Sequence, residues 1–443
     1  MADQPTSTAL SPPRRTRPTV WQLRAYRAAA ATARTILRLR PGARPAPGDR
    51  PKVTILLQHA WGMGGTIRAT LNVAGHLARD YDVEILSVLR RRDEPFFPFP
   101  PGVSVTAIDD QRRGGAGPGA RLLRRVHGRL FHPDDKVFLP STLWTDVQLL
   151  RHLWRVRSGV LMGTRPALNM LVTEAVRPGL AVVAVEHTTW RAYRDPLRQG
   201  IRRRYPHIDA VVVLNDGERR RFERALKGAT PVFTIPNAAV EPTGPPSPLD
   251  RPVVLAAGRL ARVKGFDRLV RAYAIVARER PEWRLRICGD GEERAALAAQ
   301  IDELGIAGHV ELAGTVGDME REMEQASMFV LTSRAEGLPL VMLEAMGKGL
   351  PVVSFRSPGG LRQFIEDGVD GIFVKNRDTE ALARAIVGLI DDAGERRRLG
   401  AAGREKARRY GMTAVGARWR ALVAGLLAED RSGAVVIAVD PAA

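Results

Sequence analysis

The pattern that constrains this chain most is a repeated alternation of short apolar runs with longer segments of helical period. Runs of about five residues, rich in Val, Ile and Leu, stand between segments whose apolar residues recur every three or four positions. Continuous apolar runs of that length are typical of parallel strands buried on both faces, joined by crossover helices. The alternation therefore predicts an α/β fold with parallel sheets.

The alternation occurs in two series, separated by Glu241–Asp250, a segment with four prolines that cannot sustain a helix or a strand. The first series predicts strands at 53–57, 83–88, 103–107, 159–162, 181–185 and 210–214, with helices at 66–79, 141–157, 166–177 and 216–226. The second predicts strands at 253–257, 284–288, 309–313, 328–332 and 351–355, with helices at 266–279, 292–304, 318–325, 339–347, 360–366 and 379–392. We expect two Rossmann-like doubly wound domains, at 51–243 and 250–410, with the ligand site in a cleft at the carboxyl ends of their strands.

Residues 1–50 form a basic extension with ten Arg and two Asp, and this extension carries eight of the 20 net positive charges. Its flanks, 1–18 and 41–50, are rich in Pro, Ser and Gly, which predicts disorder. Between them, Arg24, Arg27, Arg34 and Arg38 share one quadrant of a helical wheel, beside a quadrant with Leu23, Tyr26, Ala30, Ala33 and Leu37. This short amphipathic helix has two open interpretations: it lies on an anionic membrane surface, or it packs on the protein body.

Several classes of protein are excluded by composition. Cys288 is the single cysteine, so the chain has no internal disulfide and no thiolate-built metal site, which fits a reducing compartment. No apolar stretch approaches the about 20 residues that span a bilayer, and no apolar segment follows Arg14-Arg15 as an export signal requires. We therefore expect a cytoplasmic chain, with peripheral membrane contact left open.

The net charge of +20 makes a nucleic-acid-binding protein the main hypothesis from another class. Aromatic residues are only 6% of the chain, and no zinc-finger, homeodomain or RNA-binding motif is present. Salt-sensitive retention on DNA without binding of a small anionic ligand would favour that alternative. We expect no nucleic-acid partner.

Three segments at predicted strand ends carry residues suited to chemistry. The first is the glycine-rich stretch at 58–66, in which Gly62, Gly64 and Gly65 precede a helix. Glycine lets backbone N–H groups approach an anion at a helix N-terminus, although a plain strand–helix turn has the same composition.

The second segment, 257–266, places Arg259 just after a strand and Lys264 just before a helix. Together a guanidinium and an ammonium suit a diphosphate, and they also suit a leaving group that gains negative charge. The alternative is a pair of solvated surface cations.

The third segment, 332–346, contains Glu336-Gly-Leu-Pro339 in a strand–helix turn and Glu344 in the following helix. Pro339 suits the first turn of that helix. Each glutamate can accept hydrogen bonds from sugar hydroxyls, and the alternative is a helix-capping Glu336 with a surface Glu344.

Taken together, these segments resemble the retaining glycosyltransferases of family 4, which have the GT-B fold of two Rossmann-like domains. The resemblance covers about residues 52–430 and rests on the glycine-rich first loop, Gly-Arg with Lys-Gly, and Glu-Gly-Leu-Pro followed by a second Glu eight residues on. Ile235-Pro-Asn237, Gly289-Asp-Gly291, Gly314-Thr-Val316 and Ser357-Pro-Gly-Gly360 add to it. It also implies that a final helix, at 411–430, returns to the N-terminal domain.

The resemblance implies a role for each matching residue. Arg259 and Lys264 match the pair that binds the donor diphosphate, Glu336 the glutamate that grips the donor sugar, and Glu344 the one that bonds the ribose. The remaining matches are Gly337, Leu338 and Pro339 for the turn whose amides approach sugar and phosphate, Gly64 and Gly65 for the N-terminal loop near the phosphates, and Val316 for the place of the nucleobase.

A histidine after a strand of the N-terminal domain lies beside the reacting sugar in such enzymes, and His187 in Val185-Glu-His187 fits that place. The alternative for His187 is a structural hydrogen bond. His59 is a weaker candidate at the first strand end. Asn215 precedes a helix, and capping explains it fully.

The resemblance further implies retention of anomeric configuration without a carboxylate nucleophile, by a same-face reaction in which the departing diphosphate helps to deprotonate the acceptor. We expect no metal cofactor, because Asp80-Tyr-Asp82 precedes a strand, at the wrong edge for the cleft. A UDP-hexose is the favoured donor, and the acceptor class is a glycan, a lipid-linked glycan or a polyanionic wall polymer of the cell envelope. A nucleotide-sugar epimerase or a sugar phosphorylase on the same fold is the alternative.

Overall fold

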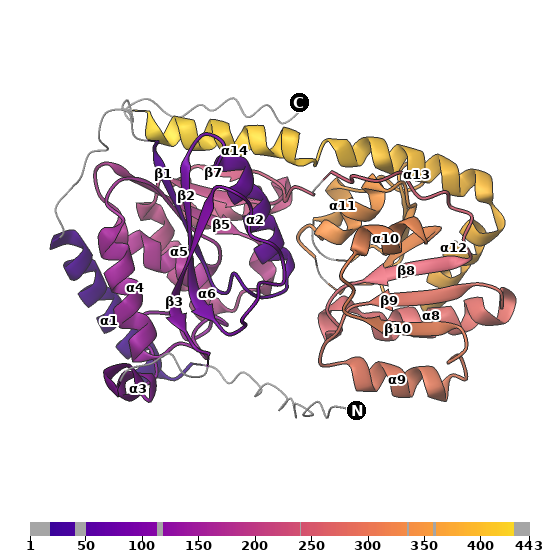
Figure 1. Ribbon diagram of the computed structural model, residues 1–443, viewed down its shortest axis with the longest axis horizontal. Coiled ribbons are helices and arrows are strands. Elements are labelled where there is room, and N and C mark those ends of the chain that lie inside the picture. Colours follow the sequence, from indigo (N-terminus) through magenta and orange to yellow (C-terminus); the bar gives the residue numbers. More distant parts are fainter. Residues whose placement is uncertain are drawn as a thin grey trace. The chain divides into compact units, whose positions relative to one another are not determined.

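The computed structural model describes residues 18–39, 50–112, 118–239, 241–334, 336–357 and 360–428. The chain divides into two compact units (Figure 1). The N-terminal unit contains Pro18–Val240, Gly337–Leu340 and the chain from Arg409, and the C-terminal unit contains Glu241–Glu336 and Val341–Arg408. Arg14-Arg15, most of the predicted disordered flanks, and positions 113–117 lie outside the described residues.

The N-terminal unit is built on a seven-stranded parallel sheet of order β3-β2-β1-β4-β5-β6-β7. The strands are β1 (Lys52–Leu57), β2 (Asp82–Arg90), β3 (Val103–Asp110), β4 (Gly159–Gly163), β5 (Leu180–Glu186), β6 (Ala210–Val213) and β7 (Val232–Thr234). The helices are α1 (Val20–Leu39), α2 (Gly65–Leu77), α3 (Pro118–Arg124), α4 (Leu143–Arg155), α5 (Pro166–Val172), α6 (Asp195–Arg204), α7 (Asp216–Leu226) and α14 (Met412–Leu427). Short 3-10 turns lie at Thr173–Ala175, Trp190–Ala192 and Tyr205–His207.

Two apolar layers cover the faces of this sheet, because its central strands are buried on both sides. One layer contains side chains of α4, α5, α6 and α7, and the other contains side chains of α2 and α14. Helix α14 buries Val415, Trp419, Leu422, Val423 and Leu426 in the second layer. A backbone hydrogen bond from Ala239 N–H to the carbonyl of Tyr410 (3.0 Å) lies just before α14.

Helix α1 packs on the body of the N-terminal unit. Its apolar face, Tyr26, Ala30, Ala33 and Leu37, is buried, with the last two in the core layer that includes α4. Arg34 of its basic face donates to Glu174 (2.6 Å). Of the two interpretations of this helix, the structure therefore favours packing on the protein, and α1 groups with the N-terminal unit.

The C-terminal unit is built on a six-stranded parallel sheet of order β10-β9-β8-β11-β12-β13. The strands are β8 (Val253–Ala257), β9 (Arg284–Cys288), β10 (Val310–Gly314), β11 (Met328–Leu331), β12 (Val352–Phe355) and β13 (Ile372–Val374). The helices are α8 (Phe266–Glu279), α9 (Arg294–Glu303), α10 (Met319–Glu324), α11 (Leu340–Gly347), α12 (Thr379–Asp391) and α13 (Ala393–Arg408), with 3-10 turns at Arg262–Lys264 and Leu361–Gln363. Helices α8, α9 and α12 share one core with the strands.

The predicted α/β class and both parallel sheets are confirmed, with differences at the edges. Strands β7 and β13 were not predicted, because each has only three residues and is half-exposed at a sheet edge. The helix predicted at 360–366 is wrong beyond Gln363: the Asp370 side chain accepts from Glu366 N–H (2.8 Å) and holds the chain in a turn there.

Helix α13 was also missed, because its buried face consists largely of small residues that leave no hydrophobic period. Gly400, Gly403 and Ala407 are buried on that face, and a side chain at Gly400 would clash with the carbonyl oxygen of Gly349. A close helix approach of this kind depends on the missing side chain, so apolar periodicity cannot indicate it.

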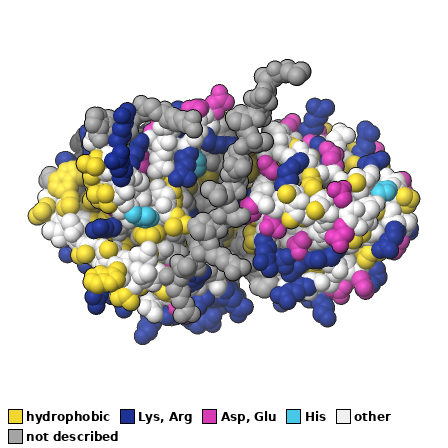
Figure 2. All heavy atoms as spheres, turned by 90° about the horizontal axis from the view of Figure 1, so that it is seen from below, with side chains coloured by type: hydrophobic (Ala, Val, Ile, Leu, Met, Phe, Trp, Pro, Cys, Tyr) yellow, Lys and Arg dark blue, Asp and Glu magenta, His cyan; other side chains and the backbone are white. Residues whose placement is uncertain are grey.

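Basic side chains outnumber acidic ones in the described part of the chain. Figure 2 shows Lys and Arg side chains on the visible surfaces of both units, with acidic side chains among them. None of the helices that the structure describes is both long and apolar enough to cross a membrane. Asp80 and Asp82 lie at the amino end of β2, as the sequence predicted.

Candidate functional site

Four neighbouring strands of the C-terminal unit, β10, β9, β8 and β11, end in turns at one edge of the sheet. The N–H of Gly289 donates to the carbonyl of Gly314 (2.7 Å), and that of Gly258 donates to Cys288 (2.9 Å). The N–H of Leu260 donates to Asp290 (3.0 Å). These bonds join the turns after β10, β9 and β8 into one layer, at the edge where doubly wound folds bind ligands.

Glycine is required where these turns approach one another. Gly289 has φ +137° and Gly265 has φ +69°, both in the region that favours glycine. A side chain at Gly289 would clash with the carbonyl oxygen of Gly258, and one at Gly265 would clash with that of Thr332. The glycines therefore set how closely the turn after β8 packs against its neighbours.

Lys264 and Glu336 are brought together in this layer. The Lys264 ammonium lies 2.5 Å from a Glu336 carboxylate oxygen, and both side chains are partly exposed, at 22% and 15%. The Thr332 hydroxyl donates to the Lys264 carbonyl (3.1 Å), which ties the end of β11 to the same turn. A cation and a carboxylate thus share one strand-end site, fixed by the backbone on both sides.

The other C-terminal candidates lie nearby in the chain but are held differently. Arg259 is exposed directly after Gly258, and its side chain makes no ion pair with any described residue. Val316 is half-buried in the loop between β10 and α10, and Glu344 is half-buried in α11. Helix α11 begins at Leu340, so Pro339 precedes the helix instead of lying in its first turn.

The segment Gly337–Leu340 groups with the N-terminal unit. Leu338 and Pro339 are buried there, and the Leu338 carbonyl accepts from the Asn237 side-chain amide (3.3 Å). A side chain at Gly337 would come within 3.4 Å of the His187 carbonyl oxygen. Asn237, which the sequence showed only as part of Ile235-Pro-Asn, is therefore a contact residue of the Gly-Leu-Pro turn.

His187 follows β5, as predicted, and is half-buried. Desolvation lowers the pKa of its imidazole to about 4, although a hydrogen bond with Asn237 opposes this shift. The buried Nδ1 atom has no hydrogen-bond partner among the described residues. The ring is therefore neutral near pH 7, and it can exchange hydrogen bonds with a hydroxyl but does not supply a charge.

Glu186, directly before His187, is a buried carboxyl that sequence reasoning missed. It accepts from the Asn169 amide (2.8 Å) and from the hydroxyls of Tyr193 and Tyr205. Desolvation raises its pKa to about 7, against the effect of these hydrogen bonds. The only feature in the sequence that points to Glu186 is an acidic residue at the end of an apolar strand. Its three hydrogen-bond partners cannot be recognised from their spacing along the chain.

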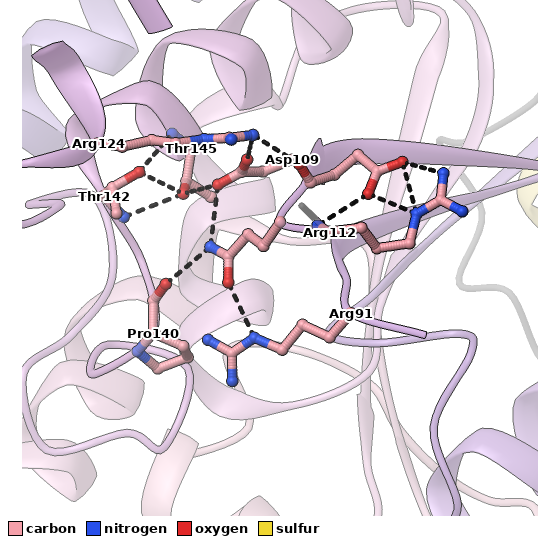
Figure 3. Close-up of polar contacts among 9 residues, drawn as sticks. Arg91, Asp109, Arg112, Arg124, Pro140, Thr142 and Thr145 are labelled. Carbon is pink, nitrogen blue, oxygen red and sulfur yellow. Dashed lines mark hydrogen bonds and ion pairs between the residues drawn. The ribbon is translucent and has the colours of Figure 1, made fainter. Parts of the chain in front are cut away.

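A second buried carboxylate lies at the end of β3 (Figure 3). Asp109 accepts from Arg124 (2.7 Å), Thr145 (2.7 Å) and Gln111 (3.0 Å), and Gln111 in turn accepts from Arg91 (2.8 Å). These contacts fix the start of α4 and the end of α3 to the sheet. This edge of the N-terminal sheet thus depends on side-chain networks.

The glycine-rich loop after β1 contains two glycines that internal packing does not require. Gly65 is the first residue of α2, and Gly64 precedes it with φ +157°. A side chain at either would meet no described atom within 4 Å, whereas one at Gly62 would press on His59 (3.0 Å). Packing within the described residues therefore does not explain these two glycines, and an anion site at the start of α2 stays a prediction.

The remaining candidates from the sequence are Asn215, which has a structural role, and His59. Asn215 caps α7 by accepting from Glu218 N–H (2.9 Å), as predicted. Desolvation lowers the pKa of His59, and nearby Arg91 and Arg92 lower it further. Among the residues that the structure describes, no three His, Cys, Asp or Glu side chains are grouped as metal ligands.

Comparisons with known proteins agree with this geometry. Residues 241–406 match the model of the family described as glycosyl transferases group 1. Over 391 residues the chain is 33% identical to exopolysaccharide phosphotransferase SCO2592 of Streptomyces coelicolor. The aligned region covers 85% of this chain but only 41% of that protein. It is 24% identical over 351 residues to an uncharacterized glycosyltransferase of Haemophilus influenzae, covering 77% of this chain and 91% of that one.

A solved structure supports the same fold. TarM of S. aureus, in a complex with fondaparinux, alpha-GlcNAc-glycerol and UDP, matches with a TM-score of 0.68 at 15% identity, over 84% of this chain and 99% of that one. This likeness confirms the predicted fold class, two Rossmann-like domains of the GT-B type. Together the comparisons support a glycosyltransferase.

Proposed function

We propose that this chain is a retaining glycosyltransferase of family 4 that moves a hexosyl unit from a nucleotide sugar, with a UDP-hexose as the favoured donor, to a glycan, a lipid-linked glycan or a wall polymer. The observation that carries the proposal is the Lys264–Glu336 pair, held in the strand-end turns of the unit that matches group 1. The relatives' names add support for a role in cell-envelope polysaccharide synthesis.

The chemistry assigned to the pair follows from its donors and acceptors. An ammonium has three N–H donors, so Lys264 can keep Glu336 and still donate to a diphosphate oxygen. The second oxygen of Glu336 is then available to a sugar hydroxyl. Charge-assisted hydrogen bonds of this kind contribute about 1.5 to 3 kcal/mol each, and the exposed Arg259 supplies a second cation.

The other assignments complete the proposed donor site. Glu344 bonds the ribose, Val316 lies against the nucleobase, and His187 hydrogen-bonds the reacting sugar or orients the acceptor. The backbone N–H groups of Gly64 and Gly65, and those of Gly337 and Leu338 in the turn that ends at Pro339, are offered to the phosphates and the sugar. A neutral His187 suits this role, because a sugar hydroxyl both donates and accepts.

The proposed reaction takes place on one face of the sugar. The bond between the anomeric carbon and the diphosphate oxygen breaks, and the acceptor oxygen bonds to the same face. The acceptor proton passes to the departing diphosphate, whose charge Lys264 and Arg259 stabilise. No metal ion is needed in this scheme, and we place the reaction in the cytoplasm. Attachment to an anionic membrane through α1 is not part of the proposal, because the apolar face of α1 is buried.

Phosphotransfer is the second candidate, because the relative at 33% identity is named an exopolysaccharide phosphotransferase. A UDP-hexose labelled with 32P in its β-phosphate separates the two reactions. Glycosyl transfer leaves the label in released UDP, whereas transfer of a sugar phosphate moves the label to the acceptor and releases UMP.

The test of the proposal combines this labelling with donor binding. We expect a UDP-sugar to raise the melting temperature of the chain more than a GDP- or ADP-sugar does, because a bound donor stabilises the folded state. With an acceptor glycan, unlabelled product and labelled UDP should form in the presence of EDTA. A donor that is epimerised without acceptor, or label found in the acceptor, would contradict the proposal.

A further inference from the structure

A polar pocket of about 500 Å3 lies on the C-terminal unit, and no donor-site candidate lines it. Its lining residues are Asp267, Arg268, Arg271, Arg334, Arg377 and Thr379. Four of these six residues are arginines and one is acidic. The pocket therefore has a strong excess of positive charge.

The one carboxylate of the pocket does not balance this charge. Both carboxylate oxygens of Asp267 accept hydrogen bonds from Arg334 (2.8 and 2.7 Å), and one of them also accepts from Arg271 (3.0 Å). Two guanidiniums therefore share this carboxylate. Arg268 and Arg377 form no ion pair with any described residue. The pocket thus contains two guanidiniums without a carboxylate partner.

Arg268 makes this imbalance costly, because it is only 7% exposed. Its guanidinium donates to the Asn376 side-chain oxygen (3.3 Å), which is a neutral acceptor. A buried charge is stabilised mainly by an opposite charge. Burial and the neighbouring guanidiniums, that of Arg334 first, lower the pKa of Arg268, and the nearby Asp267 carboxylate only partly opposes this shift. An anion in the pocket would reverse that effect.

Rigid elements position these side chains. Arg268 and Arg271 lie in the first two turns of α8, which packs against α12, and Thr379 is the first residue of α12. Arg377 lies in the loop between β13 and α12 with φ +71°, a conformation that is uncommon for a residue with a side chain. Guanidiniums present planar pairs of donors that match the oxygens of a phosphate.

We propose that this arginine pocket is a second anion site of the C-terminal unit, distinct from the Lys264–Glu336 pair, and that it binds a phosphate group. The group is either free in solution or part of a phosphate-bearing polymer. The proposal does not depend on glycosyl transfer, because it rests on residues that the donor site does not use.

The test is calorimetric titration of the full chain with two probes, inorganic pyrophosphate and a short glycerol-phosphate oligomer. Both are titrated into a background that combines Arg259→Ala with Lys264→Ala, which removes both cations of the proposed donor site. Arg377→Gly removes one guanidinium at a backbone conformation that glycine prefers, and Arg268→Met removes the other with little loss of volume. Arg278→Ala, on an exposed part of α8 outside the pocket, is the control for a change of charge.

We expect one saturable site, with a dissociation constant that rises at least tenfold in Arg377→Gly and in Arg268→Met and is unchanged in Arg278→Ala. The probe that binds more tightly identifies the source of the phosphate. If Arg268→Met does not fold, Arg377→Gly alone decides the outcome. Binding of neither probe, or equal losses in Arg377→Gly and Arg278→Ala, would overturn the proposal.

Discussion

At the carboxyl edge of the six-stranded sheet, loops are held by backbone contacts, whereas at the same edge of the seven-stranded sheet they are held by side chains. In the C-terminal unit, Gly258, Gly265 and Gly289 allow successive turns to meet, and Lys264 and Glu336 lie on those turns. In the N-terminal unit, the buried carboxyls of Asp109 and Glu186 fix long excursions of the chain.

This difference explains why the edge of the C-terminal sheet is easier to recognise from the sequence than the edge of the N-terminal sheet. A close backbone approach requires glycine at fixed positions, so it leaves a motif in the sequence. A buried carboxyl needs partners that lie far apart along the chain, as Asp109 and Thr145 do. The family model accordingly matches residues 241–406, which lie almost wholly in the unit with the glycine turns.

The largest expected effect concerns the charged pair on the glycine turns. Lys264→Ala should lower turnover about 100- to 1000-fold, as the loss of one donor to a developing charge does in other enzymes. Release of labelled UDP measures the rate, and circular dichroism checks the fold. The exposed Arg262 of the same turn provides the control: Arg262→Ala should retain most of the activity, and near-normal turnover in Lys264→Ala would remove the pair from catalysis.

The close backbone contacts between turns of the C-terminal unit are tested by Gly265→Ala. This change should destabilise the chain by about 2 kcal/mol or more, because alanine resists φ +69° and its methyl group meets the Thr332 carbonyl. Urea unfolding measures the loss. Gly388→Ala, in the exposed middle of α12 with no neighbour within 4 Å, should be neutral or slightly stabilising. Equal effects of the two changes would contradict the role given to Gly265.

The role of buried carboxyls in the N-terminal unit is tested by the pH dependence of stability. Burial raises the pKa of Glu186 to about 7 from a usual value of 4.5, so the folded state holds its proton more firmly than the unfolded state does. The stabilisation is complete below pH 4.5 and is lost as pH rises through 7, amounting to about 3 kcal/mol.

Urea unfolding of the wild type and of Glu186→Gln at pH 5 and pH 8 measures how much Glu186 contributes to the pH dependence of the free energy of unfolding. The wild type should lose stability relative to Glu186→Gln between pH 5 and pH 8, because Gln resembles the protonated carboxyl and has no proton to lose. Glu94→Gln, at an exposed glutamate, should show no such change with pH. His132 and His187, whose pKa values burial lowers to about 4, oppose the trend in both proteins alike.

The smallest effect on stability is expected at the glycine-rich loop after β1. Gly65→Ala should leave the free energy of unfolding within about 0.5 kcal/mol, since no atom lies near the added methyl group. Donor affinity, measured by calorimetry with UDP-sugar, should fall about tenfold if the start of α2 faces the phosphates. An unchanged affinity would show that this loop is an ordinary strand–helix turn.

Sequence reasoning predicted most of the fold, and the structure brings two of the singled-out residues, Lys264 and Glu336, into contact. Long apolar runs predicted the interior strands, but β7 and β13 are too short and exposed to leave such a run. The pairing of Lys264 with Glu336 was within reach, because both follow recognisable strand ends. Glu186 and the arginine pocket were not, since what matters there is which distant side chains surround a buried charge.

The position of α14 in the core of the N-terminal unit has a consequence for how the protein is made. Helix α14 covers the sheet whose first strand is β1, so the apolar side chains opposite Trp419 and Leu422 stay uncovered until α14 has been synthesised. A fragment ending at the proline-rich linker would expose that surface and should aggregate. The earliest-synthesised sheet can therefore be completed only after residues 412–427 have left the ribosome.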